Sequence, residues 1–257
     1  MQLPEYLNFV RATAIQSPAL SVIIPAFNEA SRIAQYIESI HAYLAERKEG
    51  FEIIVVDDGS RDQTSATVRA LFSSFPALAL LSYKENRGKG HAVRMGMQAA
   101  GGALRLFADA DGSTPIAELE RLRSCMQKEG ADIAIASRDV RDVSTEIVNR
   151  SHRRFIGQTF RRLREWIVPI GVQDSQCGFK LFTASAAETV FPDSCIDGFA
   201  FDVEILYRAR RAGLKIVEVP VNWTNSSMSQ VNLLTTPVKM FFDLFQIRRA
   251  INQKPKN

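Results

Sequence analysis

The feature that most constrains the fold is an alternation of short apolar runs with segments of helical periodicity. Five runs rich in β-branched residues have the length and composition of buried strands. They span residues 20–27, 51–58, 77–83, 103–109 and 131–137. Between the first two runs, Ile33, Ile37 and Ile40 recur at the spacing of one helix face. Because no tight hairpin signal joins the runs, the pattern predicts an α/β fold with a mostly parallel sheet flanked by helices.

Polar clusters follow four of these runs, each at the carboxyl end of its strand. They read PAFNE (25–29), VDDGS (56–60), ENRGKG (85–90) and DADG (109–112). Ligands of open parallel sheets bind beyond the carboxyl ends of the strands. The shared position of the clusters therefore predicts one ligand site at this edge of the sheet.

After about residue 140 the pattern changes. An Arg-rich helical stretch is followed by a polar loop over 172–182, a helix that Gly213 ends and an edge strand over 215–223. No repeat or linker interrupts the chain. We expect a lead-in over 1–19, one domain over 20–235, and a C-terminal amphipathic helix and tail over 236–257.

Composition narrows the class of protein. With 257 residues, 46% of them hydrophobic, the chain can bury an ample core, and its net charge of +4 favours anionic partners. The three cysteines and three histidines lack metal-ligand spacing, which is typical of reduced thiols and structural histidines. No apolar run reaches the ~18 residues of a membrane-spanning helix, and no signal peptide is evident. We expect a cytoplasmic protein, or one at the cytoplasmic face of a membrane, with no nucleic-acid partner.

The stretch LRLFADADGST (104–114) has two interpretations. In one, Asp109 and Asp111 belong to an ordinary Asp-rich turn that follows a strand. In the other they form a metal clamp, because two carboxylates at a strand end can hold a divalent cation against a diphosphate. The stretch alone does not decide between them.

The other clusters suit a nucleoside diphosphate that carries a sugar. Asp58 can accept an N–H from a base, and Glu29 can contact the base or the ribose. Gly88 and Gly90 let the backbone approach a ligand closely, while Arg87 and Lys89 supply positive charge. Each residue alone also fits a cap, a turn or a solvated charge. The chain lacks the glycine-rich motifs of dinucleotide-binding dehydrogenases and P-loop proteins.

Together, these motifs resemble the family 2 glycosyltransferases of GT-A fold. SVIIPAFNEA, EIIVVDDGSRDQT, NRGKGHAVRMGM, FADADGST, DSQCGFKLF and FDVEILY carry the resemblance, which spans about Leu20 to Trp223. Within the family the chain is most similar to the dolichyl- or polyprenyl-phosphate β-glucosyltransferases. The resemblance implies an inverting transferase that uses a nucleoside diphosphate sugar, UDP-glucose in that branch, together with Mg²⁺ or Mn²⁺.

The resemblance also implies roles for individual residues. Metal ligands are expected at Asp109 and Asp111, and catalytic roles at Asp111, Asp174 and Lys180. Donor contacts are expected at Pro25, Phe27, Glu29, Asp58, Gly88, Lys89, Asp109, Ala110 and Gln230. Two departures stand out: Gln230 occupies the position of a lysine that is usual in the lipid-phosphate members, and the transmembrane helices of many members are absent from this sequence.

A lipid phosphate acceptor is already an anion and needs no general base, so the enzyme has only to place it. We expect Arg138, Arg153 and Arg154 to do so. Six arginines lie between Arg150 and Arg164, on a helix whose apolar face includes Leu163 and Ile167. Such a helix indicates contact with an anionic membrane or, alternatively, an ordinary surface helix.

The last helix is apolar over more than half its circumference, through Met240, Phe241, Leu244, Phe245 and Ile251. This width exceeds that of a usual surface helix. It fits a dimer interface, contact with a bilayer, or packing against the core.

Three other functions remain open. The first is a soluble glycosyltransferase that acts on a sugar or protein hydroxyl, with Asp174 or Asp202 as general base. The second is a degenerate nucleotide-sugar binding module, for which Gln230 is the motive. The third, a nucleotidyltransferase, lacks the expected glycine-rich, Lys-bearing loop after the first strand.

Overall fold

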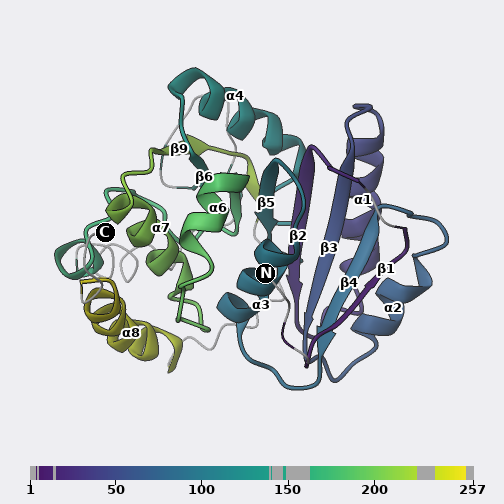
Figure 1. Ribbon diagram of the computed structural model, residues 1–257, viewed down its shortest axis with the longest axis horizontal. Coiled ribbons are helices and arrows are strands. Elements are labelled where there is room, and N and C mark those ends of the chain that lie inside the picture. Colours follow the sequence, from purple (N-terminus) through teal and green to yellow (C-terminus); the bar gives the residue numbers. More distant parts are fainter. Residues whose placement is uncertain are drawn as a thin grey trace.

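A central sheet of eight strands organises the protein (Figure 1). The computed structural model describes residues 4, 6–13, 16–138, 140, 147–148, 163–224 and 235–252. The strands are β1 (Asn8–Arg11), β2 (Leu20–Ala26), β3 (Phe51–Asp58), β4 (Leu78–Tyr83), β5 (Leu104–Ala108), β6 (Ile133–Ser137), β8 (Phe179–Thr183) and β9 (Ile216–Pro220). They lie in the order β1-β4-β3-β2-β5-β8-β6-β9. The five predicted buried runs are β2 to β6, so the predicted alternation is confirmed.

Two strands break the parallel pattern. β1 pairs antiparallel with β4 at one edge, so the lead-in contributes a strand to the sheet. β8 lies antiparallel between β5 and β6. The interpretation of residues 172–182 as a polar loop is therefore wrong for their second half, which forms a buried strand inside the sheet.

Helices cover both faces of the sheet, and alternation of side chains along the strands supplies both cores. The helices are α1 (Ile33–Ala45), α2 (Thr64–Ala70), α3 (Lys89–Ala99), α4 (Leu119–Glu129), α6 (Ala184–Val190), α7 (Phe201–Arg211) and α8 (Thr235–Asn252). In β3, Ile54 and Val56 pack with the cluster under α3, α6, α7 and α8, whereas Ile53 and Val55 pack with the cluster under α1, α2 and α4. Strands buried on both faces read as continuous apolar runs, as the sequence does here.

The parallel strands bring the polar clusters to one edge. Asp57 and Asp58 end β3, in register with Ala26 and Tyr83 of the neighbouring strands. Asp109 follows β5 directly, beside the start of β8. A two-stranded parallel sheet of β7 (Ile147–Val148) and β10 (Trp223–Thr224) adjoins this edge, since Thr224 N donates to Ser113 O at 2.9 Å.

The C-terminal helix α8 uses much of its apolar face inside the protein. Leu244 and Ile247 are fully buried, and Met240 joins them in the same core. Packing against the core, one of the three predicted options, is thus the role of this part of the helix. Phe242 and Phe245 remain exposed by 66% and 47%.

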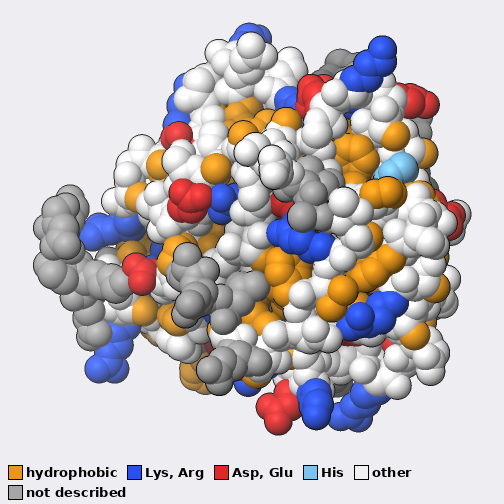
Figure 2. Space-filling model, turned by 45° about the vertical axis from the view of Figure 1, so that its right-hand side comes forward, with side chains coloured by type: hydrophobic (Ala, Val, Ile, Leu, Met, Phe, Trp, Pro, Cys, Tyr) orange, Lys and Arg blue, Asp and Glu red, His pale blue; other side chains and the backbone are white. Residues whose placement is uncertain are grey.

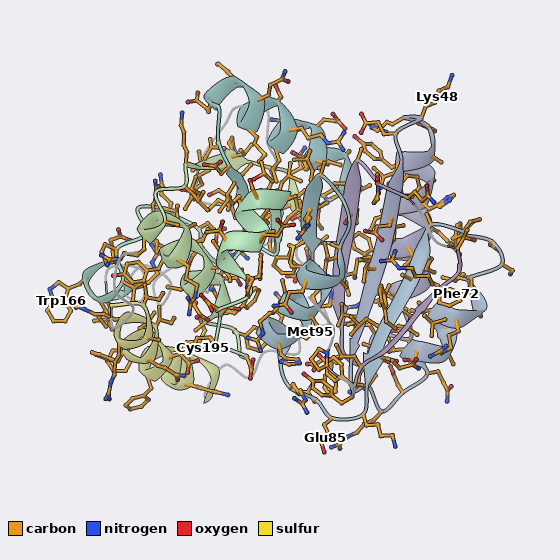
Figure 3. The ribbon with its side chains drawn as sticks, viewed as in Figure 1. Lys48, Phe72, Glu85, Met95, Trp166 and Cys195 are labelled. Carbon is orange, nitrogen blue, oxygen red and sulfur yellow. The ribbon has the colours of Figure 1, made fainter. Side chains whose placement is uncertain are left out.

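One further apolar side chain is exposed near this end of the molecule. Trp166, in a helical turn over residues 163–167, is 75% exposed and points outward at the edge of the molecule (Figure 3). On the face drawn in Figure 2, Lys and Arg side chains lie in separate places among apolar and other side chains. No helix within the described part of the chain is long and apolar enough to cross a membrane.

Candidate active site

The two aspartates after β5 lie on a tightly held turn. Asp109 N donates to Gly178 O at 2.9 Å, and the Asp111 carboxylate accepts Ser113 N at 2.9 Å within its own turn. Gly178 has no side chain for a direct reason: a Cβ there would lie 1.8 Å from Asp109 Oδ2. The Asp109 carboxylate thus packs directly against the backbone of Gly178. The sequence motif QCGFK contains this glycine, but its spacing alone does not reveal the contact.

A lysine from α3 faces the same carboxylate. Lys89 Nζ lies 2.7 Å from Asp109 Oδ1 and also lies over the Phe107 ring, 5.2 Å from its centroid. Burial acts to lower the pKa of Lys89, but the charges of Asp109 and Asp202 outweigh it and the pKa is raised. Lys89 is therefore a fixed cation beside the aspartates, as the predicted donor-phosphate contact requires.

A second ion pair lies beneath the first. Lys180 Nζ is 2.5 Å from Asp202 Oδ1 and donates to Cys177 O at 2.7 Å. Both side chains are almost fully buried, with 2% of Lys180 and 3% of Asp202 exposed. Burial raises the pKa of Asp202, against the opposing effects of Lys180 and Lys89. The structure therefore holds Lys180 in a network of fixed partners below the surface of the site.

Two residues of α1 and its approach complete the surroundings of the aspartates. Arg32 pairs with Glu29, its Nη2 donating to Oε1 at 2.7 Å. The hydrogen bond to Glu29 raises the pKa of Arg32 despite burial, and the charges of Asp111 and Asp109 add to this effect. Burial raises the pKa of the Tyr36 hydroxyl, and the same two aspartates reinforce the shift. Sequence reasoning missed Arg32 and Tyr36; their spacing of three and seven residues after Glu29 was the available signal.

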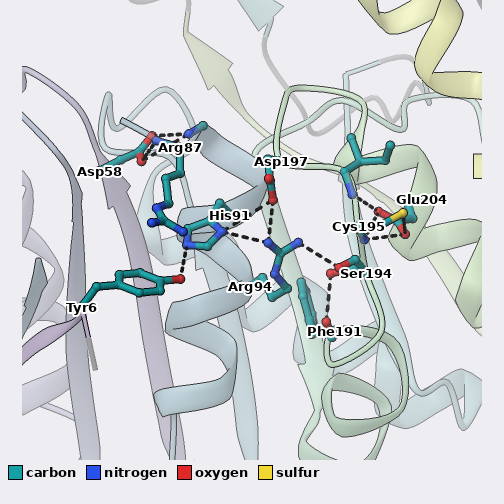
Figure 4. Close-up of polar contacts among 12 residues, drawn as sticks. Tyr6, Asp58, Arg87, His91, Arg94, Phe191, Ser194, Cys195, Asp197 and Glu204 are labelled. Carbon is teal, nitrogen blue, oxygen red and sulfur yellow. Dashed lines mark hydrogen bonds and ion pairs between the residues drawn. The ribbon is translucent and has the colours of Figure 1, made fainter. Parts of the chain in front are cut away.

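Asp58 holds the loop that follows β4 (Figure 4). Its carboxylate accepts Arg87 N at 2.8 Å, Gly88 N at 2.9 Å and Asn86 Nδ2 at 3.0 Å. Burial raises the pKa of Asp58, and the backbone N–H groups of Arg87 and Gly88 oppose the rise. The predicted contact with a base stays a prediction, but the structure gives this carboxylate a second task within the protein.

The glycines of the same loop serve contacts inside the protein. Gly88 has a φ of +104°, and a Cβ on it would lie 2.4 Å from Asp197 O. A Cβ on Gly90 would lie 2.4 Å from Ile196 O. These contacts with the 196–197 backbone account for the two glycines within the protein, and the close approach to a ligand expected of them stays a prediction.

A polar cluster fixes the start of α3 against that segment (Figure 4). Arg94 Nη2 lies 2.5 Å from Asp197 Oδ1 and 2.8 Å from His91 Nδ1, while His91 Nε2 lies 3.2 Å from the Tyr6 hydroxyl. The Arg87 guanidinium stacks over the Tyr6 ring at 3.9 Å. Because an arginine only donates, His91 Nδ1 accepts from Arg94 in this arrangement. His91 is structural, as expected.

Arg138, directly after β6, pairs with Asp174. Arg138 grips Asp174 with two parallel hydrogen bonds, Nε to Oδ2 at 2.7 Å and Nη2 to Oδ1 at 2.9 Å. Burial acts to raise the pKa of Asp174, but Arg138 outweighs it and lowers the pKa to about 2. The guanidinium also lies 5.4 Å from the centroid of the Trp223 ring. A carboxylate so strongly paired is a poor general base.

The buried thiol of Cys177 lies among charged groups of the site. Burial raises the pKa of this thiol to about 12, and the charges of Arg138, Asp174 and Lys180 also act on it. All three cysteines are free thiols, as expected. The predicted site residues with charged side chains in the described part of the chain thus gather at one edge of the sheet.

The remaining predicted residues differ in how the structure places them. Pro25 and Ala110 are buried, and Phe27 is half-buried. Gln230, Arg153 and Arg154 lie outside the described residues. Of the six arginines expected on a membrane-contacting or surface helix, Arg164 contradicts the expectation. It is 2% exposed and donates to Ser175 Oγ at 2.8 Å and Val172 O at 2.6 Å.

The aspartate pair fits a divalent cation. Asp109 and Asp111 offer hard oxygen donors, and Gly178 provides the cradle that a Cβ would fill. In the described part of the chain, no cluster of three or more His, Cys, Asp or Glu side chains could hold a metal. Two carboxylates suffice for Mg²⁺ or Mn²⁺ when substrate phosphates complete the coordination.

Sequence comparisons with known proteins identify the family of the chain. The sequence model described as "Glycosyl transferase family 2" matches residues 21–191. The chain is 37% identical over 240 residues to a dolichyl-phosphate beta-glucosyltransferase of Dictyostelium discoideum, covering 89% of this chain and 73% of the relative. The enzyme of the same name from Homo sapiens is 35% identical over 241 residues, covering 89% of this chain and 74% of the relative.

Solved structures share the fold at low sequence identity. Glucosyl-3-phosphoglycerate synthase from Mycobacterium tuberculosis, in complex with uridine diphosphate, has a TM-score of 0.64 and 19% identity over 90% of this chain and 80% of that one. A mannosyltransferase from Pyrobaculum calidifontis, in complex with GDP-Man and Mn²⁺, has a TM-score of 0.63 and 20% identity over 96% of this chain and 67% of that one. The predicted glycosyltransferase fold is confirmed.

Proposed function

Because the chain belongs to glycosyl transferase family 2, in the branch of the dolichyl-phosphate β-glucosyltransferases, we propose that it transfers glucose from UDP-glucose to a polyprenyl phosphate. The family resemblance predicted from the motifs is confirmed, and the protein is a hexosyltransferase. Inversion at the sugar places the acceptor opposite the departing diphosphate. The residues that face these two groups are therefore expected on two sides of one site.

The observation that carries the proposal is the joining of Lys89 to the aspartate pair. A cation 2.7 Å from Asp109 and a second carboxylate at Asp111 lie at the sheet edge where a diphosphate would bind. Asp109 and Asp111 would hold Mg²⁺ or Mn²⁺. The ion, when bound, neutralises charge on the leaving diphosphate. Lys89 would supply a second positive charge to the oxygens of the diphosphate.

The acceptor side favours a nucleophile that needs no base. Asp174 is committed to Arg138 and has a pKa of about 2, and Asp202 is buried against Lys180. Neither carboxylate is arranged to take a proton from a sugar hydroxyl. A phosphate acceptor carries its own negative charge, so Arg138 has only to attract and orient it. This favours the lipid phosphate over the soluble hydroxyl acceptor.

We further propose that the protein contacts an anionic membrane at the end of the molecule that carries α8. Phe242, Phe245 and Trp166 expose bulky apolar surface there, and Arg248 and Arg249 of α8 are also exposed. Exposed aromatic side chains beside cations are typical of helices that lie in a membrane interface. Such contact would bring the site to a lipid acceptor. The alternative is that a second copy of the chain covers the same patch, and co-sedimentation with vesicles distinguishes the two.

Transfer of label from UDP-[¹⁴C]glucose tests the main proposal. The protein, Mn²⁺ and a short polyprenyl phosphate are incubated, and label is counted in the organic phase after solvent extraction. We expect label in that phase only when the phosphate is present, with free polyprenol as the matched control. Label that moves instead to a water-soluble hydroxyl acceptor, or no transfer at all, contradicts the proposal.

A further inference from the structure

The buried pair Lys180–Asp202 lies beneath the metal site. Its atoms are 2.5 Å apart, and the two side chains are 2% and 3% exposed. A buried ion pair gains little stability over apolar residues of the same volume, because desolvation opposes the attraction. Its presence therefore asks for a reason other than stability.

The contacts of Lys180 lead directly to Asp109. Lys180 Nζ donates to Cys177 O at 2.7 Å, which fixes the turn that enters β8. The next residue in that turn, Gly178, accepts Asp109 N through its carbonyl at 2.9 Å. The same glycine lies so close under the Asp109 carboxylate that a Cβ would be 1.8 Å from Oδ2. A shift of the Cys177–Gly178 turn would therefore also shift the Asp109 carboxylate.

The register of the sheet reinforces the link. Phe107 of β5 pairs with Lys180 of β8, and the next pair, Ala108 with Phe179, is the last of the ladder before Asp109 and Gly178. Asp202 comes from the first turn of α7, outside the sheet, and ties that level to the helix layer. Its charge also acts on Lys89, the direct partner of Asp109. Four groups of alternating sign therefore run from the core to the metal site.

We propose that Lys180 and Asp202 are positioning residues that set the metal affinity of the aspartate pair, by holding the Cys177–Gly178 turn against Asp109. The inference rests on the proposed function, since it assumes that Asp109 and Asp111 bind the metal. It assigns Lys180 a structural task beneath the site in place of the catalytic contact expected from the resemblance, and it gives Asp202 a task other than that of general base. Outer contacts of this kind are worth roughly 10–100-fold in metal affinity when removed.

The test measures Mn²⁺ binding by titration calorimetry in the absence of acceptor, with thermal melting as the check on folding. The central variant is Lys180→Met with Asp202→Leu, which removes both charges together and so leaves no unpaired buried ion. We expect melting close to that of the parent, a fall in Mn²⁺ affinity of about tenfold or more, and unchanged binding of UDP without metal. In transfer assays the Mn²⁺ concentration for half-activity should rise, while kcat at saturating Mn²⁺ recovers.

Two further variants keep the test decisive. Gly178→Ala leaves the buried pair intact and pushes on Asp109 directly, so it should lower Mn²⁺ affinity even if the double variant folds poorly. Arg105→Met is the matched control, because Arg105 is a buried cation at the opposite end of β5 whose partner is Glu188, at 2.6 Å. It should leave Mn²⁺ affinity at the parent value.

The outcomes separate this inference from the proposed function. If the parent binds Mn²⁺ and Asp111→Asn abolishes that binding, but the folded double variant binds like the parent, the positioning role is overturned and the proposed function stands. If the parent itself binds no Mn²⁺ with or without UDP, the metal clamp and the positioning role are both overturned.

Discussion

The proposed donor and acceptor sides of the site contain buried carboxylates whose pKa values shift in opposite directions. On the donor side, Asp58 accepts mainly backbone N–H groups, and burial raises its pKa. On the acceptor side, Asp174 meets a guanidinium in a two-point pair, and its pKa falls to about 2. Both side chains are equally hidden from solvent, at 3% and 5% exposure. Burial acts to raise the pKa of both carboxylates, and only the guanidinium partner of Asp174 reverses that effect.

This difference follows from what each side has to hold. Neutral N–H groups let Asp58 organise a loop without cancelling its charge, which leaves a carboxylate suited to the N–H edge of a base. The Arg138–Asp174 pair cancels the charge of the aspartate and fixes the orientation of the arginine. An oriented guanidinium suits the planar recognition of phosphate oxygens. The Asp58 carboxylate thus keeps its negative charge for a ligand, whereas the Arg138–Asp174 pair presents an oriented cation.

The largest expected effect comes from the donor side. Asp111→Asn should lower kcat with Mn²⁺ by about 100-fold or more, because a neutral amide replaces one of two charged ligands. The side chain is only half-buried, so melting should stay within about 3 °C of the parent. Transfer assays and calorimetry with Mn²⁺ measure both. A variant with full Mn²⁺-dependent transfer would show that the aspartates are an ordinary turn.

The next prediction sharpens the role of Asp58. Asp58→Ala removes the acceptor of three hydrogen bonds from residues 86–88 and the proposed contact with the base, so UDP affinity should fall about tenfold or more. Asp57→Ala is the matched control, since Asp57 is also buried but accepts Ser60 N at 2.9 Å in the following turn. Its effect on UDP affinity should be several-fold smaller. Equal affinities for UDP in parent and Asp58→Ala, measured by calorimetry, would refute the role.

Much of the fold was predictable because β2 to β6 are buried on both faces and therefore read as plain apolar runs. β8 was missed since Lys180 interrupts its pattern. That lysine is tolerated inside the sheet only because Asp202 and the Cys177 carbonyl satisfy its ammonium group. β1 was missed for a different reason: it is an edge strand that buries little, so its sequence carries no strong period.

For the site, sequence reasoning predicted which clusters share an edge but not which groups pair there. The rule for parallel strands brings Asp58 and Asp109 to one side of the sheet. The pairing of Lys180 with Asp202 depends on the antiparallel strand β8, which the sequence pattern does not predict. Arg32 and Tyr36 approach from α1, and only the packing of that helix brings them near the aspartates.

A pH titration of stability tests the acceptor side. The pKa of Asp174 is lowered from its ordinary value of 3.8 to about 2, so its stabilising effect is complete above the ordinary value and is lost as the pH falls towards 2. The difference corresponds to about 2 kcal/mol in the free energy of unfolding. We expect the parent to lose this amount between about pH 5 and pH 2 in urea titrations, while Asp174→Asn loses correspondingly less. Parallel curves for the two proteins would mean that Arg138 does not hold the carboxylate in solution.

The smallest expected effect concerns the exposed face of α8, which presents aromatic and cationic side chains together. Each arginine near an anionic bilayer contributes about 1 kcal/mol, and salt screens that contribution. Arg248→Gln with Arg249→Gln should therefore weaken co-sedimentation with phosphatidylserine vesicles several-fold. About 0.5 M salt should reproduce this change in the parent.

Phe242→Ser with Phe245→Ser should also weaken vesicle binding, but salt should not reproduce this change, because the rings contribute through burial of apolar surface in the membrane interface. Leu244→Ser is no substitute for this pair, since Leu244 is buried in the core and its loss would unfold the helix. The membrane proposal is contradicted if the parent does not co-sediment with these vesicles at low salt. If the parent also sediments as a dimer that the Phe variants dissociate, the patch is the interface with a second copy of the chain.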